Sequence, residues 1–176
     1  MYKKDFLTKK LWTPWNKNFK RGPYNLIGKN ISIGSYCIIE DGVIIGDNVQ
    51  IGNYVFLKKG TIIESNVVID SYVRSSGDNY IGKNTVIRYG VTIAKEVEIG
   101  ESVFISPNVM TIYSTHKGVF IKKTIIKDRV FIGTAAVIGA GVVLEKDIVI
   151  GAMSYVVKDC KKVGKYVGVP ARIIEN

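Results

Sequence analysis

Histidine and cysteine are scarce in this chain of 176 residues, which has one histidine, His116, and two cysteines, Cys37 and Cys160. So few ligands exclude a zinc shell of three histidines or a cysteine cluster, and we expect no metal cofactor. Because the cysteines lie far apart in sequence, nothing indicates a disulfide framework, and a cytoplasmic location is expected. The chain has no run of eighteen apolar residues, and its first residues lack the apolar region of a signal peptide. We therefore expect neither a membrane span nor a secretion signal.

What the chain does have is an aliphatic residue at every sixth position, with one interruption at Ser75. A period of six matches neither the 3.6 of a helix nor the alternation of a strand. It indicates a repeat architecture. The first series comprises Ile27, Ile33, Ile39, Ile45, Ile51, Leu57, Ile63, Ile69, Ile81, Ile87, Ile93, Ile99 and Ile105, and the second comprises Ile126, Ile132, Ile138, Leu144, Ile150 and Val156.

Each hexad has an internal pattern that predicts one short strand and one turn. A small or β-branched residue follows four positions after the aliphatic residue, as Val49 follows Ile45. Glycine often stands directly after the aliphatic residue, as at Gly46 and Gly52. Glycine relieves crowding and permits a positive φ, so we expect it to form the turn. The two apolar series should point inward, where stacked coils bury them as a continuous ladder.

This pattern resembles that of the hexapeptide-repeat transferases, over about residues 26–175. The resemblance implies an all-β fold, a left-handed parallel β-helix with three hexads per coil and little helix. We expect an N-terminal cap at residues 1–25, the β-helix at 26–159 with a loop at 111–125, and a C-terminal tail at 160–176. The same solenoid without activity, as a scaffold, is the alternative. Zinc-dependent carbonic anhydrases share the solenoid, but they need three histidine ligands.

Positive charge is concentrated at the N-terminus of a chain whose net charge is +10. Residues 1–24 hold seven basic residues and one acidic residue, interleaved with Trp12 and Trp15. This segment is expected to cover the open end of the solenoid. A weak contact with an anionic membrane surface is a second reading. Nucleic-acid binding is not expected, because the solenoid carries no recognisable nucleic-acid motif.

The repeat has one large break, and it contains His116. The offset from Ile105 to Ile126 is not a multiple of six, so about nine residues leave the coil between Thr111 and Lys123. The residues from Ile105 to His116 resemble the stretch before the catalytic histidine of the maltose and galactoside acetyltransferases. The resemblance implies that His116 is the general base, a role that a neutral imidazole can fill near neutral pH.

After this break, the segments Gly151–Asp159 and Gly168–Ile174 resemble the coenzyme A region of the same enzymes. The resemblance implies acetyl-CoA as co-substrate, bound between the subunits of a homotrimer. It places the backbone N–H of Thr134 against the thioester oxygen and Ala152 beside the pantetheine arm. Lys158 and Arg172 would then meet the coenzyme A phosphates. The alternative for these two cations is an ordinary solvated charge.

The acceptor is expected to be a saccharide. About five coils precede the histidine loop, a layout that resembles the N-acetyltransferases of nucleotide-linked amino sugars in surface-polysaccharide synthesis. A sugar O-acetyltransferase is the alternative. Asn84, Arg88 and Asn108 are the candidate acceptor-binding residues. The stretch Arg74–Asn79 is a candidate acceptor cleft or a simple surface bulge.

Overall fold

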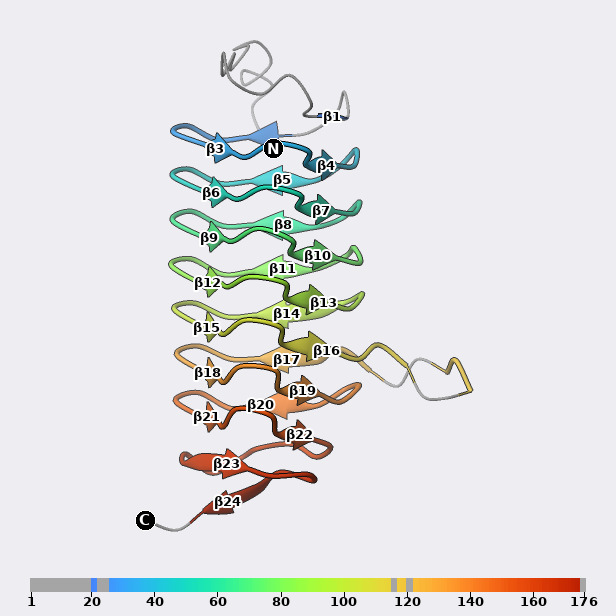
Figure 1. The fold of residues 1–176 in the computed structure, drawn as a ribbon, viewed down its shortest axis with the longest axis vertical. Coiled ribbons are helices and arrows are strands. Elements are labelled where there is room, and N and C mark those ends of the chain that lie inside the picture. Colours follow the sequence, from blue (N-terminus) through green and yellow to red (C-terminus); the bar gives the residue numbers. More distant parts are fainter. Residues whose placement is uncertain (1–19, 22–25, 115–116, 120–121, 175–176) are drawn as a thin grey trace, which may run out of the picture.

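The chain forms an all-β solenoid of about eight turns, in parallel sheets consistent with a left-handed β-helix. The computed structural model describes residues 20–21, 26–114, 117–119 and 122–174. Every regular element within those residues is a strand. Figure 1 shows the strands stacked in three columns along one long axis. The all-β class predicted from the hexads is confirmed.

Three sheets form the sides of the solenoid, and each coil contributes one strand to each sheet. Sheet A contains β1 (Lys20–Arg21), β4 (Ile38–Ile39), β7 (Phe56–Leu57), β10 (Arg74–Ser75), β13 (Thr92–Ile93), β16 (Met110–Thr111), β19 (Val137–Ile138) and β22 (Tyr155–Val156). Sheet B contains β2 (Leu26–Ile27), β5 (Ile44–Ile45), β8 (Ile62–Ile63), β11 (Tyr80–Ile81), β14 (Val97–Ile99), β17 (Thr124–Ile126) and β20 (Val143–Leu144). Sheet C contains β3 (Ser32–Ile33), β6 (Gln50–Ile51), β9 (Val68–Ile69), β12 (Val86–Ile87), β15 (Phe104–Ile105), β18 (Phe131–Ile132), β21 (Val149–Ile150), β23 (Lys165–Val167) and β24 (Arg172–Ile174).

The turns between sheets form three corners, each running the length of the solenoid. The C–A corner lies between each sheet C strand and the sheet A strand that follows it, as at residues 34–37. The A–B corner includes residues 58–61, and the B–C corner includes residues 46–49. Most successive coils are in register at an offset of 18 residues, as in the pairing of Ile51 with Ile69. The excursion raises the offset to 27, as in the pairing of Ile99 with Ile126. Only β23 and β24 pair antiparallel among the described strands.

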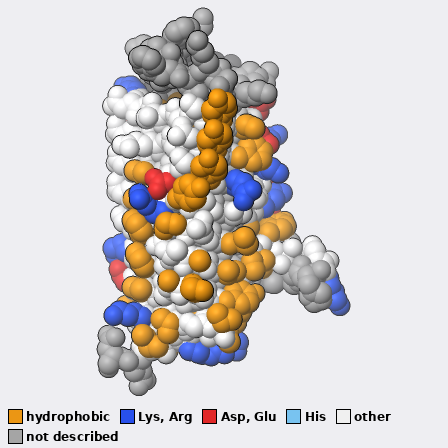
Figure 2. Space-filling model, viewed as in Figure 1, with side chains coloured by type: hydrophobic (Ala, Val, Ile, Leu, Met, Phe, Trp, Pro, Cys, Tyr) orange, Lys and Arg blue, Asp and Glu red, His pale blue; other side chains and the backbone are white. Residues whose placement is uncertain are grey.

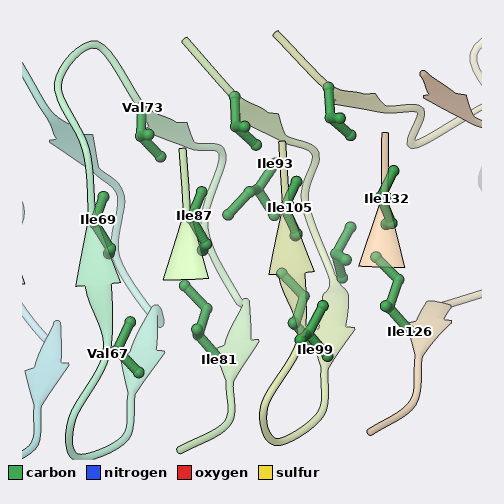
Figure 3. Packing of buried hydrophobic residues seen from close by; sticks show 14 of the residues in the cluster. Val67, Ile69, Val73, Ile81, Ile87, Ile93, Ile99, Ile105, Ile126 and Ile132 are labelled. Atoms are coloured by element: carbon green, nitrogen blue, oxygen red, sulfur yellow. The ribbon is translucent and has the colours of Figure 1, made fainter. Parts of the chain in front are cut away.

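Both apolar series point into the solenoid, as the sequence predicted. Ile81, Ile87 and Ile105 are at most 1% exposed, and the small residue Val67 is fully buried. Figure 3 shows these side chains meeting inside the coils. Complete burial of one such side chain is worth about 1.5–3 kcal/mol, so the ladder is the main source of stability.

Glycine has a different role from the one expected at the turns. Gly46 and Gly52 are not among the residues with positive φ. A Cβ on Gly46 would lie 2.7 Å from the backbone nitrogen of Ser65 in the next coil, so glycine is needed there for close approach. The positive φ falls two residues later, as at Asn48 with φ 58°. The prediction that these glycines supply the left-handed turn was wrong, whereas their relief of crowding is confirmed.

Ser75 interrupts the aliphatic series because a buried polar network replaces the apolar contact. Its hydroxyl lies 2.7 Å from that of Thr61 and 2.6 Å from Oδ1 of Asn79, and all three side chains are buried. The amide of Asn79 donates to the carbonyl of Ala94 at 2.6 Å. Arg74 and Ser75 form β10, in register with the strands on both sides. The stretch Arg74–Asn79 is therefore a regular strand and turn of the repeat and not a bulge, and its role as an acceptor cleft stays a prediction.

The excursion from the repeat lies between β16 and β17, at residues 112–123, and leaves at the A–B corner. Figure 1 shows it projecting from the side of the stack. Most of the predicted cap, residues 1–25, lies outside the described residues, although β1 pairs with β4 and extends sheet A. No described helix is long and apolar enough to cross a membrane.

Candidate functional site

The C–A corner contains four of the predicted site residues, Arg88, Asn108, Thr134 and Ala152, and Arg172 lies near its lower end. Asn108 lies in this corner after β15, and Thr134 and Ala152 follow in the next two coils. The carbonyl of Thr134 accepts a hydrogen bond of 2.8 Å from the N–H of Met153, which fixes the two coils together. Arg172 begins β24 and pairs with Val167, whose side chain lies against Gly151. Arg172 therefore closes the lower end of this corner.

In the first coils, side chains of the next coil cap the backbone N–H groups of this corner. The N–H of Ser35 donates to Oδ1 of Asn53 at 2.7 Å, and that of Asn53 donates to Oγ of Ser71 at 2.9 Å. Ala152 stands at the equivalent place beneath Thr134, and its methyl group cannot accept a hydrogen bond. Within the described part of the chain, the N–H of Thr134 has no acceptor. An exposed donor is therefore free to bind an oxygen atom of a ligand.

An apolar strip borders this donor on the lower part of sheet C. Phe104 and Phe131 stack with ring centroids 5.5 Å apart and planes 7° apart. Their side chains are 38% and 41% exposed. Phe131 precedes Thr134 by three residues, so the strip lies directly beside the corner. It offers a surface for the apolar part of a ligand whose polar group meets Thr134.

Lys158 lies apart from these residues, at the A–B corner after β22. Sheet A separates it from the column of Thr134 and Ala152. The excursion returns close to it, because Nζ of Lys122 lies 3.7 Å from Oδ2 of Asp159. Lys158 and Arg172 are both exposed. They occupy the same end of the solenoid but different corners.

His116 lies outside the described residues, so the structure does not test its predicted role as general base. The described neighbours on either side, Ser114 and Lys117, belong to the loop that projects from the A–B corner (Figure 1). The Thr134 amide lies at the other edge of sheet A. One side of a coil contains six residues, so the distance across sheet A is about 20 Å at most. Within one chain, the base of the loop and the Thr134 amide therefore lie at opposite edges of sheet A.

Asn84 takes part in a structural ladder at the B–C corner rather than in this column. The amide of Asn66 donates to Oδ1 of Asn84 at 3.2 Å, and the same contact joins Asn30 to Asn48 and Asn48 to Asn66. All four have positive φ, a conformation that asparagine tolerates well. The structure therefore does not bring Asn84 together with Thr134.

Arg88 lies closer to the column, just after β12 on the C–A side. Its Nε lies 3.2 Å from Oδ2 of Asp70, and the two side chains are 45% and 29% exposed. The adjoining residue, Tyr89, accepts a hydrogen bond of 2.9 Å from the N–H of Asn108 through its carbonyl. Arg88 and Asn108 are thus in neighbouring coils of one corner.

Sequence reasoning missed a ladder of tyrosines on the same corner. Tyr36, Tyr54 and Tyr72 stack with centroids 5.0 Å apart, and Tyr89 follows at 5.2 Å. Figure 2 shows a hydrophobic column down the upper part of this face. The available signal was the spacing of 18 residues, which equals one coil of three hexads. No group of three or more potential metal ligands occurs among the described residues.

Two family descriptions match the chain, and they cover different coils. "Bacterial transferase hexapeptide (six repeats)" matches residues 26–59, and "Hexapeptide repeat of succinyl-transferase" matches residues 123–158. No curated protein matches the chain in sequence. The two descriptions lie on either side of the excursion.

Solved structures share the fold at low sequence identity. The polySia-specific acetyltransferase NeuO is 22% identical over 91% of this chain and 84% of its own, with a TM-score of 0.60. The Arabidopsis UDP-N-acetylglucosamine acyltransferase is 19% identical over 93% of this chain and 73% of its own, with a TM-score of 0.59. The chain spans 55% of the PglB acetyltransferase domain from Neisseria gonorrhoeae, which is 14% identical over 86% of this chain, with a TM-score of 0.48.

Proposed function

We propose that this chain, whose residues 26–59 and 123–158 match descriptions of hexapeptide-repeat transferases, transfers an acyl group from coenzyme A to a saccharide. The observation that carries the proposal is the uncapped N–H of Thr134 above Ala152. Acyl transfer from a thioester needs a hydrogen-bond donor where negative charge develops on the carbonyl oxygen. The Thr134 amide supplies such a donor on a rigid coil.

The residues near the Thr134 amide suit the binding of coenzyme A, the acyl donor. The pantetheine arm would lie along Ala152 and the apolar strip of Phe104 and Phe131, which suits its mixed polar and apolar character. Arg172 at the lower end of the corner would hold a phosphate, for which its guanidinium offers several fixed donors. Lys158 would add a mobile positive charge from the A–B corner of another copy. No metal takes part in this scheme.

The position of the loop supports a homotrimer as the active form. The loop that contains His116 leaves one edge of sheet A, and the Thr134 amide lies at the other. If flat sides pack around a threefold axis, the loop of one copy meets the corner of its neighbour. We propose that the site is shared in this way, with His116 as general base. Each copy would then contribute one base and one donor site.

The first acceptor we propose is the amino group of a nucleotide-linked amino sugar. The nitrogen attacks the thioester carbonyl, His116 takes the proton that the amine sheds, and the C–S bond breaks. The products are an amide and free coenzyme A, whose sulfur receives a proton. Support for an amino sugar comes from the five coils before the loop. The fold shared with the Arabidopsis UDP-N-acetylglucosamine acyltransferase supports only the nucleotide-linked sugar, because the amine of that sugar already carries an acetyl group.

A second candidate acceptor is a hydroxyl of a saccharide chain. The tyrosine ladder and the open C–A corner favour it, because they extend the candidate site along the axis for several coils. The fold is also shared with the polySia-specific acetyltransferase NeuO. A hydroxyl is a weaker nucleophile than an amine, so this reaction would depend more strongly on the base.

The test is acetyl-CoA consumption by the purified chain, measured as free thiol released in the presence of each acceptor class. Nucleotide-linked amino sugars and oligosaccharides are supplied separately, and the acylated atom is located by NMR. We expect release with one class and none without acceptor. Light scattering on the same sample should give three times the mass of the chain. The absence of acceptor-dependent release with both classes would overturn the proposed function.

A further inference from the structure

The tyrosine ladder of the C–A corner is unusual because its backbone is left-handed. Tyr36, Tyr54 and Tyr72 have φ of 58°, 57° and 64°. A bulky residue rarely adopts this conformation, for which glycine and asparagine are suited. The equivalent position is Gly90 in the fourth coil and Asn108 in the fifth. The fold can therefore form this turn without tyrosine, and ring contacts are what the tyrosines add.

The rings stack upon one another, yet about half of each side chain remains exposed. Exposed fractions are 52% for Tyr36, 47% for Tyr54 and Tyr72, and 49% for Tyr89. Because stacking covers the ring faces of the first three, their edges and hydroxyl groups form a row along the axis. Tyr89 stands one residue earlier in its coil and tilts by 54° from Tyr72. Its ring turns toward sheet C.

Beside the ladder, the upper part of sheet C is hollowed by an open groove of about 390 Å³. Its floor is formed by the outward residues Ser32, Gln50 and Val68, and its wall by Asp70, Ser71 and Tyr89. Arg88 holds the Asp70 carboxylate at the lower end of the groove. The space suits a ligand of one or two sugar rings, with the ladder continuing past it.

The groove offers polar groups beside Val68, whereas the outward positions of the next four strands of sheet C are apolar. The outward positions of later sheet C strands are Val86, Phe104, Phe131 and Val149. Ser32 and Gln50 instead offer a hydroxyl and an amide, and Asp70 offers carboxylate oxygens. Within the described chain, the N–H of Ser71 also has no acceptor, because Tyr89 stands where a capping side chain would be. Donors and acceptors are thus mixed within one shallow groove.

We propose that this groove and the tyrosine ladder bind a saccharide chain that lies along the C–A corner. The proposal rests on the second candidate of the proposed function, a saccharide chain as acceptor, and adds a site for units beyond the reacting one. Mixed amide, carboxylate and hydroxyl groups match the donors and acceptors of sugar hydroxyls. The edges and hydroxyls of half-exposed tyrosines match the alternating polar and apolar rim of a pyranose.

The direction of the corner connects this surface to the candidate acyl site. Tyr89 and Asn108 are joined by a backbone hydrogen bond, and the N–H of Ala135 donates to the carbonyl of Pro107 at 2.9 Å. Thr134 is thus two coils below Tyr89 on the same edge. A chain that occupies the groove and ladder would direct one end toward Asn108 and Thr134.

The experiment measures saccharide binding by titration calorimetry without coenzyme A, so that it does not depend on turnover. The probes are a sialic acid tetramer, a neutral glucose tetramer, and the two monosaccharides. We expect at least one tetramer to bind tenfold or more tightly than its monosaccharide. The two tetramers distinguish an acidic chain from a neutral one. Failure of both tetramers to bind would overturn this inference, whatever the acyl-transfer assay shows.

Two variants locate the site, each with a matched control. Gln50→Ala removes a groove amide from an exposed strand position, and Glu98→Ala makes a comparable truncation on sheet B. Tyr54→Asn breaks the ladder with a residue that accepts positive φ, and Tyr80→Asn removes an exposed tyrosine of sheet B. We expect a fivefold or greater loss of tetramer affinity in Gln50→Ala and Tyr54→Asn only.

Light scattering on the same variants separates this proposal from its rival, a contact between copies of the chain. Loss of assembly in Tyr54→Asn, with unchanged tetramer affinity in Gln50→Ala, would assign the ladder to such a contact and overturn the proposal. Thermal melting checks that each variant is folded. If Tyr54→Asn does not fold, Gln50→Ala decides alone, because its side chain lies outside the core.

Discussion

Ala152 lies one coil below Thr134, at the place from which Asn53 caps the N–H of Ser35 in the first coils. A methyl group in place of a carboxamide leaves the Thr134 amide as an exposed donor. The capped amides stabilise the coil, whereas this one is available to a ligand. The Ser71 amide of the same corner is also uncapped, but only the Thr134 amide of these two lies beside the stacked rings of Phe104 and Phe131.

Ala152→Ser should restore the cap and reduce activity. The hydroxyl of Ser71 accepts from the equivalent amide of Asn53, so the hydroxyl introduced by the substitution should accept from Thr134. Loss of one donor to the developing oxyanion lowers kcat by about 10²–10³. The new hydrogen bond should raise stability by about 0.5–1.5 kcal/mol. Steady-state kinetics and thermal melting measure both effects.

The control for that variant is Asn53→Ala, which removes a cap far from the candidate acyl site. It should lower the melting temperature and leave kcat unchanged. Full activity in a folded Ala152→Ser protein would show that the Thr134 amide is not the donor.

His116→Ala should lower kcat by about 10²–10⁴ if the imidazole is the general base. Folding should survive, because the loop is outside the buried ladder. With a hydroxyl acceptor, the loss should be near the upper end and persist as pH rises. With an amine acceptor, alkaline pH should restore part of the rate, since more of the amine is unprotonated. A pH–rate profile with each acceptor measures this, and Lys123→Ala controls for a change in the loop. Turnover like that of the wild type at all pH values would eliminate His116 as base.

Arg172→Ala should raise the KM for acetyl-CoA and leave kcat nearly unchanged. A phosphate contact remote from the thioester binds ground state and transition state equally. Loss of one charge-assisted contact costs about 1.5–3 kcal/mol, which corresponds to about 10–100-fold in KM. Lys83→Ala, on the B–C corner, controls for the loss of one positive charge. An unchanged KM would reject the assignment of Arg172.

Acid should lower the stability of the coils after the excursion, because two aspartates there become protonated. A hydrogen bond from Lys146 lowers the pKa of Asp128, and one from Arg129 lowers that of Asp147, both from the ordinary value of 3.8. Because the folded pKa values are the lower ones, their contribution is present above pH 4 and is lost as pH falls through those values. The double variant Asp128→Asn, Asp147→Asn should show a shallower fall in melting temperature between pH 5 and about pH 2. A fall as steep as in the wild type would show that these pairs do not contribute.

Neither cysteine should react in the folded protein. Burial raises the pKa of the Cys160 thiol to about 11, and it raises the pKa of Cys37 as well. At pH 8 about one Cys160 in a thousand would be thiolate. Alkylation by iodoacetamide, followed by mass spectrometry, should be slow in buffer and rapid in denaturant. Rapid labelling of the folded chain would contradict the burial of these thiols.

The inward positions could be predicted because each aliphatic residue, such as Ile87, meets the same environment in every coil. The role of Ser75 could not be predicted from the repeat. Its hydrogen-bond partners, Thr61 and Asn79, lie 14 and 4 residues away in sequence, and neither separation is a multiple of six. The sequence predicted that glycine relieves crowding, but it did not predict that the positive φ falls two residues later, at positions such as Asn48. The catalytic assignment of His116 stays a prediction.

Periodicity along the chain was sufficient to define the repeat, the inward ladder and the place of the excursion, because each of these depends on spacing within one sequence. The stacked coils were needed to show which residues share a corner, since residues 18 apart become neighbours only when coils stack. That stacking places Ala152 beneath Thr134, leaves Asn84 in a different corner and aligns four tyrosines on the edge that leads to Thr134. Such relationships depend on hydrogen-bond caps and ring contacts between coils, which no local pattern of six residues contains.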